Sequence, residues 1–66
     1  MIIELSNGIQ CEIKLINLSG GSVDYRRIND PVYTGDCVLY LQVTSLASAE
    51  EEIKAALEAE LVKPKV

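Results

Sequence analysis

The sequence predicts a small α+β domain, an antiparallel β-meander of three to four strands with one C-terminal α-helix packed on one face. Apolar and polar residues alternate along short stretches of residues 1–45, which is typical of half-buried strands. Residues 46–62 instead repeat apolar side chains at helical spacing. A 66-residue chain forms one domain, here expected over residues 1–62, and an oligomer or a partner often completes so small a core. Pro64 stops the helix, and residues 63–66 form a basic tail.

The first two strands are joined by a turn of sequence Ser-Asn-Gly. A two-residue Asn-Gly loop would turn the apolar faces of the two strands apart. In a three-residue loop, Gly8 adopts the left-handed conformation and Leu5 pairs with Ile9. Ile3 then lies opposite Cys11, and the apolar side chains share one face. Because a slip of one residue inverts every side chain, we expect the three-residue loop.

Two further strands are expected after a turn of sequence Ser-Gly-Gly-Ser. Residues 23–28 form the third strand, which ends at an Asn-Asp-Pro sequence. Residues 37–44 form the fourth, because apolar and polar residues alternate along it. Its inward face is predicted to carry Cys37, Leu39, Leu41 and Val43. Val38 and Tyr40 then lie on the opposite face.

The helix over residues 46–62 carries its own start signal. Ser48 followed by Glu51 fits a capping box, in which both side chains accept hydrogen bonds from otherwise unsatisfied N–H groups. The apolar stripe of the helix consists of Leu46, Ala49, Ile53, Ala56, Leu57 and Leu61. Strands and helix together predict a core of Ile3, Leu5, Ile9, Cys11, Ile13, Leu15, Leu39, Leu41, Val43, Ile53, Leu57 and Leu61.

The composition disfavours several classes of function. Without His, the chain has no Ser–His or Cys–His nucleophile and no imidazole metal ligand. Ten acidic and six basic residues give a net charge of −4, which disfavours direct binding to nucleic acid or to an anionic membrane. No apolar run approaches the roughly 20 residues of a membrane span, and no signal peptide is visible. We therefore expect a cytoplasmic protein that is not an enzyme and needs no cofactor or metal.

The two cysteines, Cys11 and Cys37, are expected on the inward faces of their strands. Two reduced thiols that pack as small apolar side chains are the first interpretation. A disulfide is the alternative, because the two strands could be neighbours in the sheet. A zinc site is disfavoured, since zinc takes about four ligands and two cysteines without histidine cannot supply them.

One candidate surface for binding another protein is the acidic face of the helix. Residues 46–62 carry five acids and one base. The acids are Glu50, Glu51, Glu52, Glu58 and Glu60. Such a face could imitate the phosphates of a nucleic acid and block a basic groove. The alternative is structural, because acids in the first helical turn stabilise the helix dipole.

The second candidate surface is the sheet face opposite the helix. Every aromatic residue of the chain is Tyr, a type that, like Arg, is enriched at interface hot spots. The residues predicted to contribute are Tyr25, Arg26, Arg27, Val38 and Tyr40. A sheet with one helix leaves this face uncovered, and exposed apolar groups there mark interaction sites. The alternative is an ordinary half-solvated sheet face.

These observations lead to two hypotheses of function. The first is a non-enzymatic acidic protein-binding module, a small inhibitor or adaptor that occupies a basic surface of a nucleic-acid-handling protein complex. In size and charge it resembles inhibitors of the anti-CRISPR and anti-restriction kind, an analogy that no sequence motif supports. The second is a homo-oligomeric structural or assembly protein, such as a homodimer, that closes its open sheet face against copies of itself.

Overall fold

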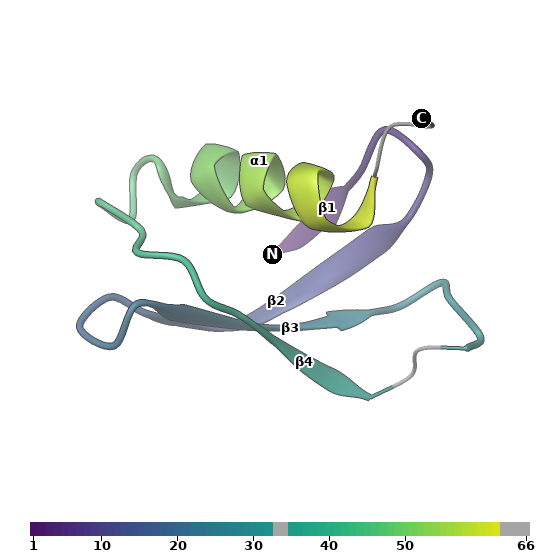
Figure 1. Ribbon diagram of the computed structural model, residues 1–66, viewed down its shortest axis with the longest axis horizontal. Helices are drawn as coiled ribbons and strands as arrows, with labels where there is room; N and C mark the ends of the chain where they lie inside the picture. Colours follow the sequence, from purple (N-terminus) through teal and green to yellow (C-terminus); the bar gives the residue numbers. More distant parts are fainter. Residues whose placement is uncertain (33–34, 63–66) are drawn as a thin grey trace.

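The computed structural model of the chain describes residues 1–32 and 35–62. It shows a four-stranded antiparallel sheet with one helix across one face (Figure 1). The elements are β1 (Ile2–Glu4), β2 (Gln10–Asn17), β3 (Ser22–Arg27), β4 (Asp36–Leu39) and α1 (Ala49–Leu61). Each strand pairs with the next strand of the chain, which confirms the predicted α+β meander. The expected basic tail lies outside the described residues.

The hairpin of β1 and β2 has the predicted three-residue loop. The Leu5 N–H donates to the Ile9 carbonyl at 2.8 Å, and the Gly8 N–H donates to the Leu5 carbonyl at 3.0 Å. Gly8 has a φ of 89°, a left-handed conformation that favours glycine. Ile3 lies opposite Cys11, so the apolar side chains gather on the face that α1 covers.

The strand β2 contains a β-bulge at Lys14, which the sequence did not predict. Leu15 pairs with Asp24, and Ile16 pairs with Val23, so one residue of β2 has no partner on β3. The extra residue reverses the alternation beyond it. Leu15 therefore faces away from α1 with 59 % of its surface exposed, and its predicted place in the core is wrong. Ile16 faces the core instead.

The core lies between the sheet and α1. Its buried residues are Ile3, Leu5, Cys11, Val23, Tyr25, Leu39, Val43, Ala49, Ile53 and Leu57. Ile9, Ile13, Leu41 and Leu61, also predicted for the core, are only partly buried against it. Val23 and Tyr25 enter because β3 turns alternate residues toward α1. Burying one large aliphatic side chain stabilises a fold by about 1.5–3 kcal/mol, so Ile53 and Leu57 anchor the helix.

The fourth strand is shorter than predicted. It ends at Leu39, and residues 40–44 continue without strand pairing. The reason lies in β3, which begins at Ser22 and so offers no partner beyond Tyr40. The Gln42 side chain instead donates to the Leu18 carbonyl at 2.6 Å and ties this segment to the turn between β2 and β3.

The helix begins at Ala49, three residues later than predicted, and the capping box is absent. The Ser48 side chain makes no capping bond to the backbone. Glu52, not Glu51, reaches back, and its carboxylate accepts from the Thr44 N–H at 3.2 Å and from the Ser48 hydroxyl at 2.6 Å. Leu46 therefore precedes the helix and is 69 % exposed, so its predicted place in the apolar stripe is wrong.

Candidate protein-binding surface

Within the described residues, α1 covers one face of the sheet and leaves the other face open (Figure 1). Strand pairing and alternation place these residues on that uncovered face: Ile2, Glu12, Lys14, Leu15, Asp24, Arg26, Asp36 and Val38. Tyr40 continues the alternation just after β4. Val38 is 51 % exposed and Tyr40 85 % exposed. Ile2 thus lies at the β1 edge of this face, and Val38 and Tyr40 lie at its β4 edge.

Ion pairs occupy the middle of the uncovered face. The guanidinium of Arg26 lies 3.0 Å from the Glu12 carboxylate on the neighbouring strand. The Lys14 ammonium lies 3.5 Å from the Asp36 carboxylate and reaches across β3. These groups are well exposed, so each pair contributes at most about 1 kcal/mol. Arg26 lies on the uncovered face, as predicted, and its guanidinium is paired there with Glu12.

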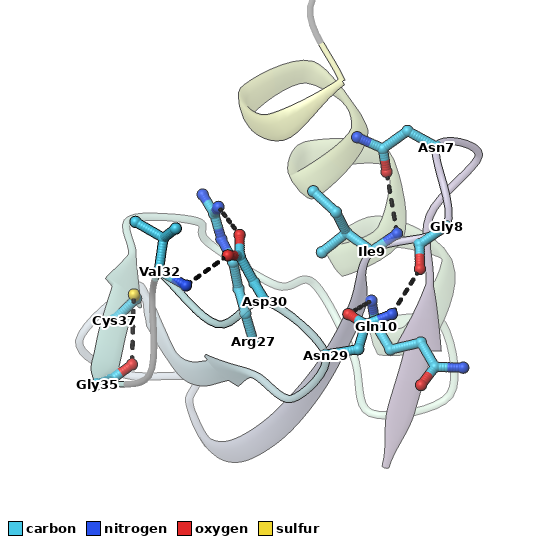
Figure 2. A network of polar contacts seen from close by, with 10 residues as sticks. All are labelled: Asn7, Gly8, Ile9, Gln10, Arg27, Asn29, Asp30, Val32, Gly35 and Cys37. Atoms are coloured by element: carbon cyan, nitrogen blue, oxygen red, sulfur yellow. Dashed lines mark hydrogen bonds and ion pairs between the residues drawn. The ribbon is translucent and has the colours of Figure 1, made fainter.

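Two residues predicted for the uncovered face lie on the helix side instead. Tyr25 is only 7 % exposed, and burial raises the pKa of its phenol. Arg27 follows it by two residues and shares its face, where its guanidinium lies 3.0 Å from the Asp30 carboxylate (Figure 2). The prediction was wrong because β3 shows no clean apolar alternation, and Val23 fixes which of its residues turn inward.

Polar contacts fasten the loop after β3 to the first hairpin (Figure 2). The Asn29 side chain accepts from the Gln10 N–H and donates to the Gly8 carbonyl, each at 2.9 Å. Asp30 accepts from the Val32 N–H at 3.0 Å in addition to its contact with Arg27. These contacts connect the loop after β3 to the β1–β2 hairpin and to β3 itself.

Two of the five predicted acids on the helix make hydrogen bonds within the molecule. The Glu58 carboxylate accepts from the Ser6 hydroxyl and from the Ser6 N–H, each at 2.7 Å. These bonds hold the pKa of Glu58 below its usual value. Glu52 is bound by Ser48 and Thr44, which lower its pKa in the same way. Both carboxylates therefore fix α1 against neighbouring segments.

The other three acids, Glu50, Glu51 and Glu60, are exposed but do not form one face. At 100° per residue, Glu51 lies about 100° from Glu50, and Glu60 lies on the opposite side of the helix from Glu51. A continuous acidic surface needs acids on neighbouring positions, three or four residues apart. The helix thus offers separate charges and not the acidic face expected from composition.

An apolar groove lies at the β1 edge of the sheet, beside the start of the helix. It has a volume of about 280 Å³ and is lined by Met1, Ile13, Lys14, Leu15, Ile16 and Leu46. The groove exists because β2 extends to Asn17, whereas β1 pairs only from Ile2 onward. Pockets for small molecules measure about 300–1,000 Å³, so this groove suits one inserted side chain.

One flank of α1 borders this edge of the sheet. Glu50, Lys54 and Glu58 are spaced four residues apart and so share a flank. The Glu58–Ser6 bonds identify that flank as the one next to β1. Glu50 is at its N-terminal end, the end nearest Leu46 in the chain. Lys14, which lines the groove, forms an ion pair with Asp36.

This groove was not predicted from the sequence. The exposure of Met1 and Leu46 and the bulge that turns Leu15 outward all contribute to it. One signal was present in the sequence. The apolar stretch before the Ser-Asn-Gly turn is shorter than the apolar stretch that follows that turn. Antiparallel strands of unequal length leave the longer one without a partner at its far end.

Cys11 and Cys37 are both free thiols. β3 lies between their strands, so they are not on neighbouring strands. Two strand spacings amount to about 10 Å, more than a disulfide spans between Cα atoms. Burial raises the pKa of the Cys11 thiol, as expected of a packed apolar side chain.

The described residues contain no cluster of three or more His, Cys, Asp or Glu placed to hold a metal ion. In the same part of the chain, no helix has the length and apolar character needed to cross a membrane. Comparison with protein-family models, with curated proteins and with solved structures finds no match for this chain.

Proposed function

We propose that this chain is a non-enzymatic protein-binding module, an inhibitor or adaptor, that holds its partner at the apolar groove beside Leu46. The observation that carries the proposal is the hollow itself, with Met1, Leu15 and Leu46 exposed around it. Exposed apolar groups that gather around a concave site mark binding surfaces more often than scattered ones do.

The partner we propose is a protein that inserts one apolar side chain and carries basic residues around it. The chain has a net charge of −4, and Glu50, in the first turn of α1, follows the groove residue Leu46 by four positions in the chain. Lys14, the cation of the groove, is already balanced by Asp36. Proteins that handle nucleic acids present basic surfaces of this kind. Glu50 and the net negative charge of the chain then contribute attraction, and the groove provides the specific contact.

The test is capture of the partner by matched variants of the purified, immobilised chain. Leu46→Lys places a charge in the groove, and Val32→Lys makes the same change at an apolar residue that is 77 % exposed and does not line the groove. Both are incubated with a lysate of the source cells, and bound proteins are identified by mass spectrometry. We expect wild type and Val32→Lys to retain the same basic protein and Leu46→Lys to lose at least nine-tenths of it.

Retention of that protein by Leu46→Lys in wild-type amount would contradict the proposal. Equal loss from both variants would contradict it too, because the effect would then follow from added positive charge alone. Glu50→Gln should weaken capture only several-fold, and a high-salt wash should reduce binding, since exposed charge pairs are screened.

A further inference from the structure

The outer edge of β4 presents unpaired backbone groups in a known order. Leu5 bonds to Ile9, and Ile13 bonds to Met1, so alternate residues of β2 point their backbone groups to β1 and the others to β3. The registers of the β2–β3 and β3–β4 pairs carry this alternation on to the fourth strand. The backbone N–H and C=O groups of Cys37 and Leu39 in β4 therefore point toward β3.

The N–H and C=O groups of Asp36, Val38 and Tyr40 therefore point away from the sheet. No hydrogen bond to these groups is present among the described residues. Such an open row is a template for another strand.

The two edges of the sheet differ in how they are protected. β1 is three residues long, carries Glu4 and contacts α1. β4 is one residue longer and carries one acid, Asp36, at its first residue, but it has no Lys, no Pro and no bulge among its paired residues, and Val38 within it is exposed. Proteins usually block a free edge with such features. Because β4 lacks Lys, Pro and a bulge, and α1 packs against β1, β4 is the less protected edge and the one we expect to accept a strand.

We propose that a second copy of this chain pairs antiparallel along β4, with a two-fold axis at Val38. Val38 then lies opposite Val38 of the partner subunit, and Asp36 lies opposite Tyr40 of the partner subunit. These outward-pointing pairs can exchange backbone hydrogen bonds. The two sheets become one continuous sheet with both helices on the same face. This inference stands independently of the groove.

The chemistry of the side chains favours this register. It brings apolar Val38 onto its own copy and sets the Asp36 carboxylate across from a phenolic O–H that can donate to it. On the helix side, Cys37 meets Leu39 of the partner subunit. Centring the pair on Asp36 would instead set two like charges opposite each other, which is destabilising.

The edge is short, and interfaces well below about 1,200 Å² are weak. We therefore expect a dimer that dissociates on dilution. Because its contacts are backbone and apolar, added salt should not weaken it, in contrast to a complex held by charge.

The experiment is sedimentation velocity of the full chain over a hundredfold range of concentration, with Val38→Pro as the test variant. Proline removes an N–H that has no partner within the protomer, and edge strands tolerate it where that group faces solvent. Val38→Thr is the control, since it keeps the N–H and the β-branched shape. We expect a shift from monomer to dimer mass for wild type and Val38→Thr, and monomer throughout for Val38→Pro.

A second measurement keeps the proposal testable if Val38→Pro fails to fold. Amide exchange of Val38 and Tyr40 in the wild-type chain should slow at least tenfold between dilute and concentrated solution. The proposal would be overturned if the wild type had monomer mass at every concentration. It would also be overturned if the two amides exchanged as fast in concentrated as in dilute solution. Leu46→Lys should dimerise normally, so loss of the groove partner and loss of the dimer are distinguishable.

Discussion

The two faces of the sheet differ in where their apolar residues lie. On the helix side, apolar residues fill the middle, with Val23 and Cys11 fully buried. On the uncovered face, the ion pair of Glu12 with Arg26 occupies the middle, and apolar side chains such as Leu15 lie toward the edges. Among the exposed apolar side chains of the uncovered face, Leu15 and Val38 lie near the two opposite edges of the sheet. Those edges are where we place the groove and the β4 pairing.

The largest expected difference between the faces concerns stability. Leu57→Ala leaves a cavity under the helix and should lower the free energy of unfolding by about 2–5 kcal/mol. That loss is a large part of the stability of so small a domain. Val38→Ala, on the uncovered face, should change the free energy by no more than about 0.5 kcal/mol in dilute solution. Urea unfolding of both variants checks this, and similar losses would mean that the two faces do not differ.

The second prediction concerns pH, through the bonds that fix the helix. The pKa of Glu58 is lowered in the folded protein, so its stabilising effect is complete above its ordinary pKa of 4.5 and is lost as pH falls through the lower folded value. Glu58→Gln should therefore flatten the fall in stability below pH 4.5. Glu51→Gln is the matched control, because the Glu51 carboxylate makes no hydrogen bond among the described residues. The free energy of unfolding of each variant is measured by denaturant unfolding at several pH values. Below pH 4.5 it should fall less steeply for Glu58→Gln than for Glu51→Gln, and equal slopes would contradict the role of the Ser6 contact.

The smallest expected effect comes from the middle of the uncovered face. A double-mutant cycle on Glu12 and Arg26 should give a coupling free energy of about 0.2–1 kcal/mol, because both groups are well exposed. The coupling should shrink in high salt. A coupling of several kcal/mol would show that the ion pair supports the fold as strongly as the apolar core does.

The sequence was sufficient for the fold class and for the register of the first hairpin. The three-residue loop follows from one condition, that Ile3, Leu5 and Cys11 share a face, and the structure satisfies it. It was not sufficient for the bulge at Lys14, because the apolar alternation runs on to Leu15 without a break. A bulge changes which residues face the core without changing the pattern that is read along the chain.

The candidate surface was only partly predictable. Alternation placed Val38 and Tyr40 away from the helix, where both are exposed. It misplaced Tyr25, because a polar tip on an aromatic ring suits a buried and a half-exposed position equally well. The acids of the helix were misread as one face because Glu58 binds Ser6 in the first hairpin and Glu52 binds Thr44 and Ser48, just before the helix. The Glu58 contact depends on the tertiary fold and leaves no local pattern.

The most direct test of the central claim measures partner capture and unfolding on the same variant. Leu46→Lys should lose the basic partner while its free energy of unfolding stays within about 0.5 kcal/mol of wild type, since Leu46 is 69 % exposed. That result would show that this edge serves binding and not folding. Capture at the wild-type level, or a loss of capture that accompanies unfolding, would contradict the account.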